Sequence, residues 1–556
     1  MFSKSFQGLN VAELLVRCLE SQGVTHVFGI PGAKIDPVFE ALADAGPELV
    51  VCRHEQNAAF IAGGIGRMTG RPGVCVATSG PGVTNLATGL VTANTEGQPV
   101  VAFSGAVPTN MENLETHQSL DNVNLLRPVT KHSVSLRSPG SVGLTISNAF
   151  RAALEGRPGA SYVSLPYDLL LQEASEEPPS KLLEIQYGPA DINAIEEVAG
   201  HLSAAEHPVI LVGRGGSEPK AVEAIRRLLR KSRIPVVITY EAAGVITPDL
   251  ADIFCGRVGL FRNQPGDKLL AEADVIMTVG FDEVEYDPEI WPSHDDATLI
   301  HAARIPAQIR SSYKPDVELI GDIAATLEAM SPLLSMKGSP SDHSIVQNVL
   351  GEYKAFVKHD PVDSGSGIHP LQFINALHEI VDDQTTIACD VGSVYIWMSR
   401  YFLGGDANRL LFSNGQQTLG VALPWAIAAT IARPDDQVIS MSGDGGFLFS
   451  AMELETAVRL GSNFVHVVWR DGSYDMVGIQ QELKYGRRFG DTFGEPDIVK
   501  FAEAFGASGM RIQKPGDIEA VLREGLATPG PVLVDMPVDY ASNLKLCETM
   551  NARSQH

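Results

Sequence analysis

The hexapeptide SGDGGF, at positions 442–447, lies between two different hydrophobic patterns. An apolar, β-rich segment, 437–441, precedes it, and apolar residues recur at helical spacing over 452–460. This order predicts a strand, a tight turn and a helix. Glycines let the backbone pass close to a ligand, and the N-terminus of the following helix favours an anion.

Two aspartates make this turn a candidate metal site. Asp444 lies in the turn, and a second predicted strand, 464–469, brings Asp471 to the same end of the sheet. Carboxylate oxygens suit a Mg²⁺ that holds a diphosphate. A Gly-Asp-Gly turn also occurs in parallel sheets for conformational reasons alone, so the turn does not identify a ligand by itself.

Length, composition and charge limit the classes of protein to which this chain can belong. A chain of 556 residues that is 44% hydrophobic and 20% charged indicates a globular protein of about three domains. The formal net charge is −25, and no basic stripe interrupts it, which argues against nucleic acid as a partner. The apolar run 423–432 is far too short to span a membrane.

The six cysteines have no CxxC spacing, so we expect free thiols in a reducing compartment. Helical periodicity begins at Val11, behind Asn10 as a predicted N-cap, and leaves no room for a targeting segment. We therefore expect a cytoplasmic protein with no membrane partner.

Helices and strands alternate along most of the chain. The alternation predicts an α/β protein with three doubly wound parallel-sheet domains, at 1–175, 190–340 and 365–556. Polar or glycine-rich stretches at the junctions are typical of linkers.

Five motifs occur in an order that resembles one enzyme family. They are GIPG at 29–32, RHE at 53–55, TSGPG at 78–82, NGQQTLG at 414–420, and the 443–471 region. The chain resembles the thiamine-diphosphate enzymes over nearly its whole length, and among them the catabolic, FAD-independent acetolactate synthases. The resemblance implies a pyrimidine-binding domain, a Rossmann-like middle domain and a diphosphate-binding domain.

The implied reaction decarboxylates one pyruvate on thiamine diphosphate and couples the hydroxyethyl group to a second pyruvate, giving 2-acetolactate and CO₂. Another thiamine-diphosphate decarboxylase of 2-keto acids, or an acetohydroxyacid synthase accepting 2-ketobutyrate, is the alternative. A non-catalytic cofactor-binding homologue is a third interpretation, against which the intact Glu55, Asp444 and Asp471 speak.

Glu55 is the expected catalytic residue. Its position between a strand and a helix also suits a carboxylate that serves only the helix dipole. The resemblance implies instead that Glu55 hydrogen-bonds the pyrimidine ring and acts with it as an internal base.

The remaining cofactor residues follow from the same resemblance. It assigns Mg²⁺ to Asp444, Asp471 and the Ser473 carbonyl, although the family more often has asparagine at 471. The expected diphosphate contacts are Gly392, Ser393, Gly445 and Gly446.

Within 414–420, Leu419 is either a core leucine or the apolar wedge that bends the cofactor. Gln417 would offer its backbone carbonyl to the cofactor's amino group, and many relatives have glycine there.

Gln118 and Gln480 are expected to line the substrate pocket, unless they are solvent-facing amides. Biosynthetic relatives carry tryptophan where Gln480 stands, which favours pyruvate as the second substrate here. Lys34 is either a cation for the pyruvate carboxylate or a surface lysine.

FAD is not expected. Biosynthetic relatives bind it with an arginine-containing run where this chain reads GFDEVEY at 280–286. In the family, the glutamate of one subunit meets the diphosphate turn of another, so the resemblance implies at least a homodimer and makes a homotetramer plausible.

Overall fold

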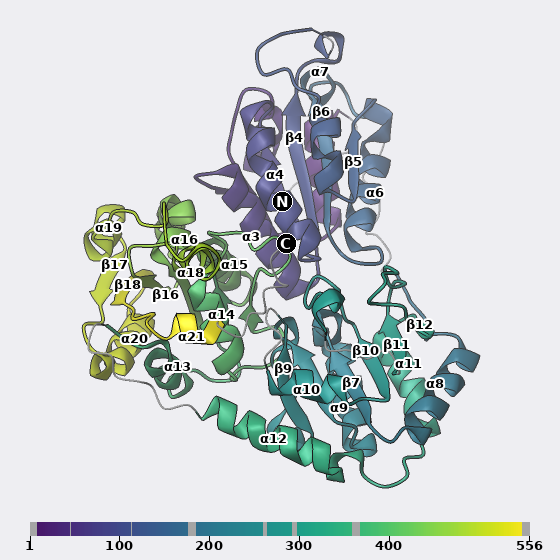
Figure 1. The fold of residues 1–556 in the computed structure, drawn as a ribbon. Coiled ribbons are helices and arrows are strands. Elements are labelled where there is room, and N and C mark those ends of the chain that lie inside the picture. Colours follow the sequence, from purple (N-terminus) through teal and green to yellow (C-terminus); the bar gives the residue numbers. More distant parts are fainter. Residues whose placement is uncertain are drawn as a thin grey trace.

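The computed structural model describes residues 8–44, 46–112, 114–175, 185–259, 264–291, 297–358 and 367–547. These residues form three six-stranded sheets, and every pair of neighbouring strands runs parallel. Helices cover the sheets, which lie in three bodies around a common centre (Figure 1). The predicted fold class is confirmed.

The first sheet has the order β2-β1-β3-β4-β6-β5. Its strands are β1 (His26–Gly29), β2 (Glu48–Val51), β3 (Gly73–Ala77), β4 (Val100–Ala106), β5 (His132–Ser135) and β6 (Ala160–Pro166). Its helices are α1 (Val11–Ser21), α2 (Asp36–Asp44), α3 (Glu55–Thr69), α4 (Pro81–Thr95), α5 (Asn122–Leu126), α6 (Val142–Leu154) and α7 (Tyr167–Leu170).

The second sheet has the order β12-β11-β10-β7-β8-β9, which is the Rossmann order. Its strands are β7 (Pro208–Val212), β8 (Val236–Thr239), β9 (Phe254–Val258), β10 (Val275–Val279), β11 (Thr298–Ala303) and β12 (Val317–Ile320). Its helices are α8 (Ile192–Ala204), α9 (Pro219–Ser232), α10 (Pro265–Ala271), α11 (Ile323–Met330) and α12 (Ser344–Val357).

The third sheet, β14-β13-β15-β16-β18-β17, repeats the topology of the first. Its strands are β13 (Thr386–Cys389), β14 (Leu410–Leu411), β15 (Val438–Gly443), β16 (Phe464–Arg470), β17 (Ser508–Arg511) and β18 (Pro531–Pro537). Its helices are α13 (Pro370–His378), α14 (Ser393–Tyr401), α15 (Ala422–Ala432), α16 (Asp444–Ser450), α17 (Leu454–Leu460), α18 (Asp475–Tyr485), α19 (Ile498–Phe505), α20 (Ile518–Ala527) and α21 (Asn543–Cys547).

The predicted strand, turn and helix around 442–447 are present, with one difference. The helix begins at Asp444 itself, and a short 3₁₀ turn, Ala451–Glu453, divides it from α17. The predicted cap at Asn10 is also confirmed, because its side chain accepts a hydrogen bond from the Glu13 amide.

The first and third domains pack through α3 and α15 (Figure 1). A side chain at Gly64 would come within 2.8 Å of Ala428 Cβ, so the glycine allows a close helix crossing. Every residue of 422–429 is buried, because α15 is covered by its own sheet on one side and by α3 on the other. Within the residues that the structure describes, no helix combines the length and apolar character needed to cross a bilayer.

Candidate cofactor site

Asp444 joins two loops at the carboxyl end of the third sheet. Its Oδ1 accepts a hydrogen bond from the Gly445 amide at 2.9 Å. Its Oδ2 accepts from the amides of Gly472, at 2.7 Å, and Asp471, at 3.2 Å. The side chain is fully buried, so β15 and β16 hold this carboxylate in one orientation.

Asp471 lies beside it in a region of concentrated negative charge. Burial raises the pKa of Asp471 to about 7, and the nearby carboxylates of Asp444 and Asp475 add to this effect. Burial also raises the pKa of Asp444. A divalent cation fits here, because it would compensate these charges with the oxygen ligands that Mg²⁺ prefers.

Ser473 completes the candidate metal loop, and its hydroxyl donates to Asp471 Oδ2 at 2.5 Å. Among the described residues, no group of three His, Cys, Asp or Glu side chains is arranged to hold a metal ion. A cation bound between Asp444 and Asp471 would therefore need further oxygen donors, of which the Ser473 carbonyl is the expected one.

The four expected diphosphate residues lie at the same end of the sheet. Gly392 has φ +125° and precedes α14, whose first residue, Ser393, donates its hydroxyl to Asp475 Oδ2 at 2.7 Å. Side chains at Gly445 and Gly446 would lie 2.6 Å from the Tyr474 ring and 3.3 Å from the Asp390 carboxyl carbon. Only bare backbone fits at Gly445, because the Tyr474 ring lies within contact distance.

The 414–420 segment reaches this loop through Asp390. The Gly420 amide donates to both carboxylate oxygens of Asp390 at 3.0 Å. Gln417 is exposed and has φ +48°, a left-handed conformation that favours glycine. Leu419 is half-buried, so it is not an ordinary core leucine.

Glu55 lies in the first domain, as the first residue of α3. Its side chain is only 7% exposed, and Oε2 accepts a hydrogen bond from Asn85 Nδ2 at 2.9 Å. A side chain at Gly82 would lie 3.4 Å from Oε1. The carboxylate thus occupies a built position against the first turns of α4, which a helix-dipole role alone would not require.

Two of the three expected substrate residues lie at the same edge of the first sheet. Gln118, at φ +61°, accepts a hydrogen bond from Ser79 and packs on Gly80. The backbone of Lys34 lies against Gly105 at the end of β4, and its ammonium is 5.7 Å from the Tyr167 ring centroid. Gln480 is exposed in the second turn of α18, in the third domain, the helix that follows the metal loop.

The site residues therefore form two groups. The first, around Glu55, contains Gln118 and Lys34, and the second, around Asp444, contains Gln480. Among the described residues, no hydrogen bond or ion pair joins Glu55 to Asp444 or Asp471.

Comparison with known proteins fits this arrangement. The N-terminal, central and C-terminal domains of thiamine pyrophosphate enzymes match residues 9–125, 195–330 and 390–536. The acetolactate synthase of Bacillus subtilis (strain 168) is 50% identical over 537 residues, which cover 96% of this chain and 94% of that protein. The chain belongs to the acetolactate synthase family of thiamine pyrophosphate enzymes.

Other members of this family cover the chain as completely. The catabolic acetolactate synthase of Raoultella terrigena is 43% identical over 96% of this chain and 95% of its own length. The large subunit of acetolactate synthase isozyme 2 of Escherichia coli is 31% identical over 96% of this chain and 97% of its own. The resemblance drawn from the five motifs is confirmed.

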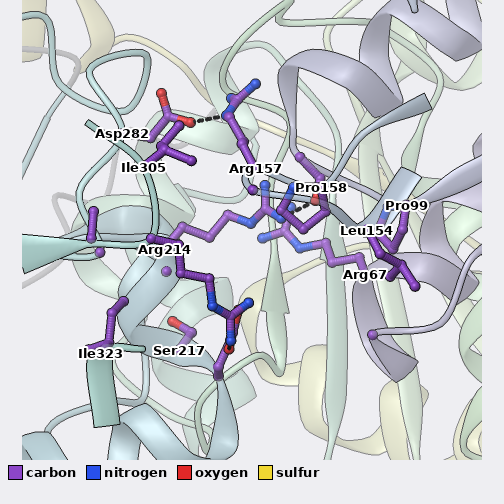
Figure 2. Close-up of a pocket in the computed structure, with 18 of the residues that line it drawn as sticks. Arg67, Pro99, Leu154, Arg157, Pro158, Arg214, Ser217, Asp282, Ile305 and Ile323 are labelled. Atoms are coloured by element: carbon purple, nitrogen blue, oxygen red, sulfur yellow. Dashed lines mark hydrogen bonds and ion pairs between the residues drawn. The ribbon is translucent and has the colours of Figure 1, made fainter. Parts of the chain in front are cut away.

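In this family member, a cavity of about 910 Å³ lies between the first and middle domains. The 280–286 run that borders it lacks arginine, but the fold brings arginines from other segments. They are Arg67, Arg71, Arg151, Arg157, Arg214, Arg304 and Arg310. Figure 2 shows Arg67, Arg157 and Arg214 converging on the cavity, with Asp282 facing Arg157.

A carboxylate already occupies the turn at which a Rossmann sheet receives phosphate. Glu285 accepts hydrogen bonds from the Arg214 amide, which follows β7, at 3.0 and 3.1 Å. The hydroxyl of Thr239 donates to it at 2.5 Å. Burial, with the charge of Asp282, raises the pKa of Glu285 to about 8. An internal carboxylate thus accepts from the Arg214 backbone amide at this turn.

Three residues of the candidate site were not predicted from the sequence. Asp390 follows β13 as Asp444 follows β15, and this repeated strand-then-aspartate pattern could have identified it. Asp475 accepts hydrogen bonds from Ser393 and from Asn543, and its position two residues after Ser473 is a weak signal. Asn85 has no such signal, because only the packing of α4 on α3 brings it to Glu55.

Proposed function

We propose that the protein joins two molecules of pyruvate into 2-acetolactate with loss of one CO₂. The observation that carries this proposal is the buried Glu55 carboxylate, which Asn85 orients from one side. Sequence kinship to acetolactate synthases supports the same reaction.

Thiamine diphosphate, when bound, supplies the electron sink that the loss of CO₂ from a 2-keto acid requires. Glu55 would hold a proton at Oε1, toward the pyrimidine ring, because Oε2 already accepts from Asn85. Burial of this carboxylate excludes water that would otherwise compete for the proton.

The third domain would hold the other end of the cofactor. We propose Asp444, Asp471 and the Ser473 carbonyl as Mg²⁺ ligands, and the amides near Gly392, Ser393, Gly445 and Gly446 as donors to the diphosphate. The Gln417 carbonyl and the Leu419 side chain would meet the pyrimidine side. These roles correspond to domains at 1–175, 190–340 and 365–556.

For the substrate, we propose that Lys34 and Gln118 bind from the first domain and Gln480 from the third. Lys34 supplies a cation for a pyruvate carboxylate, and the two amides supply hydrogen-bond donors and acceptors. Glutamine in place of a large ring at 480 favours pyruvate over 2-ketobutyrate as the second substrate.

FAD would have no part in this enzyme. The support is Glu285, whose carboxylate uses the Arg214 amide, and the internal pairing of the cavity arginines. Arg157 is paired with Asp282, Arg304 with Glu218, and Arg310 with Glu283.

The active unit would be at least a homodimer, and we propose a homotetramer. The family resemblance, in which the glutamate of one subunit meets the diphosphate turn of another, supports a site shared between subunits. Apolar side chains beside the third-domain group are exposed in the single chain, among them Leu448 and Phe449 at 42% and 46%. Burying them against a second copy would remove this apolar surface from water.

All six cysteines are buried, free thiols, which supports the expected reducing, cytoplasmic setting.

The reaction is tested by identifying what the purified protein makes from pyruvate. 2-Acetolactate as the main product supports the proposal, and acetaldehyde as the main product would overturn it in favour of a simple decarboxylase.

A further inference from the structure

Glu96, at the C-terminal end of α4, is a buried carboxylate that the proposed mechanism does not use. It is 2% exposed, and its Oε1 accepts hydrogen bonds from the Gly415 amide at 2.8 Å and the Ser413 hydroxyl at 3.0 Å. Glu96 belongs to the first domain, whereas both donors belong to the third. The carboxylate thus binds the beginning of the 414–420 segment from another domain.

The last turns of α4 make further contacts with this segment. The hydroxyls of Thr92 and Thr418 are 2.8 Å apart. A side chain at Gly415 would lie 3.1 Å from Thr95 Cβ, so the backbone of the segment passes directly over the helix. Because these contacts lie on both sides of Gln417, α4 supports the segment along most of its length.

The middle domain holds the same segment from a third direction. Asn414 donates its amide hydrogens to the backbone carbonyls of Val284 and Glu285 at 3.0 and 3.1 Å. Its Oδ1 accepts from the Tyr395 hydroxyl at 2.8 Å. All three domains therefore meet at 413–415.

Arg214 is close enough to Glu96 for their charges to attract, and the Glu241 carboxylate is also near Glu96 at this junction. Arg67 pairs with Glu241 at 2.5 Å and donates to the Phe412 carbonyl at 2.7 Å. Arg214 donates to the carbonyl of Gly97, the residue after Glu96, at 2.6 Å. A buried carboxylate with a cation nearby is a strong hydrogen-bond acceptor, so the two hydrogen bonds that Glu96 accepts hold the 413–415 backbone in place.

Carboxylates thus anchor the segment at both ends: Glu96 holds Gly415, and Asp390 holds Gly420. Between these anchors lie Gln417, in its left-handed conformation, and Leu419. We propose that Glu96 is a positioning residue, which places the Gln417 carbonyl and the Leu419 side chain for the pyrimidine side of thiamine diphosphate. This inference rests on the cofactor assignment of the proposed function.

The test separates the two ends of the cofactor. Binding of thiamine diphosphate and of inorganic diphosphate, each with Mg²⁺, is measured by isothermal titration calorimetry on the full-length protein. Glu96→Ala is expected to weaken thiamine diphosphate binding about tenfold to hundredfold, the range for losing charge-assisted hydrogen bonds. Binding of inorganic diphosphate should change by less than about twofold, because its donors do not touch Glu96.

Two variants serve as controls. Glu96→Gln keeps an oxygen acceptor, and its affinity for thiamine diphosphate should return to within about threefold of wild type. Glu155→Ala removes an exposed carboxylate at the equivalent C-terminal position of α6, in the same domain, and should leave both affinities unchanged.

If Glu96 had a purely structural role, Glu96→Ala would weaken the binding of both ligands together, and this result would overturn the inference. Wild-type affinities in Glu96→Ala would overturn it as well. If Glu96→Ala does not fold, Thr92→Val removes one hydroxyl contact to the segment with little change in shape. A loss of about fivefold in thiamine diphosphate affinity alone is then expected, and no loss overturns the inference. Wild-type protein that binds inorganic diphosphate but not thiamine diphosphate would instead contradict the proposed function.

Discussion

A pair of inactive variants should restore each other's activity if the active site is divided between subunits. Glu55→Gln removes the carboxylate in the first domain, and Asp444→Ala removes the buried metal ligand in the third. Each variant alone should be inactive, because every site in its homodimer lacks one essential group. Asn85 can still donate to the side-chain amide oxygen that Glu55→Gln leaves in place, so this variant should keep its fold.

Mixed dimers would behave differently. In each one, the intact Glu55 of one chain meets the intact Asp444 of the other, and the second site lacks both groups. Random pairing of equal amounts puts about half of the chains in mixed dimers, each with one working site, so about a quarter of wild-type activity should return. The assay is pyruvate consumption by the whole mixture, after co-expression of both chains with the same affinity tag, so that mixed and unmixed dimers are purified together.

The double variant provides a matched control. When wild type is co-expressed with an equal amount of the Glu55→Gln, Asp444→Ala chain, shared sites should leave about a quarter of full activity, and sites within one chain should leave about half. Activity near zero in the first mixture together with half in the second would refute the shared site.

Two other predictions concern the segment at 417 and the acid at 285. Gln417→Gly should raise the unfolding free energy by up to about 1 kcal/mol, because glycine tolerates φ +48°. Gln416→Gly, where the backbone is not left-handed, should lower the unfolding free energy by about 0.5–1 kcal/mol. The urea concentration at the unfolding midpoint measures both changes. Glu285 has a folded-state pKa of about 8 against an ordinary value of 4.5, so between these pH values the folded state binds one more proton, and the unfolding free energy falls as pH rises. Glu285→Gln should reduce this fall by a few kcal/mol between about pH 5 and 8, measured by urea unfolding at both pH values, and an identical pH dependence in the two proteins would contradict it.

Local sequence patterns predicted much of the fold and the positions of the candidate site residues at the ends of strands. The apolar run before 442–447 and the periodic residues after it identified β15 and the helical region that follows, because both periods are properties of short segments. The start of the helix at Asp444 was harder to predict from the sequence, since it depends on the three amides that hold the Asp444 side chain.

Residues that act across domains could not be predicted in this way. Glu96 lies in a polar stretch at a helix end, and its partner Gly415 is more than 300 residues away in the chain. The arginines of the cavity come from both domains, so the arginine-poor 280–286 run did not reveal them. Such contacts depend on how α3, α4 and the middle sheet pack, and the hydrophobic periodicity of a short segment does not predict that packing.

The product formed from pyruvate tests the central claim most directly. Purified protein with thiamine diphosphate and Mg²⁺, and without FAD, should convert two pyruvates into one 2-acetolactate and one CO₂, and added FAD should not change the rate. Acetaldehyde as the main product, or turnover that requires FAD, would contradict this account.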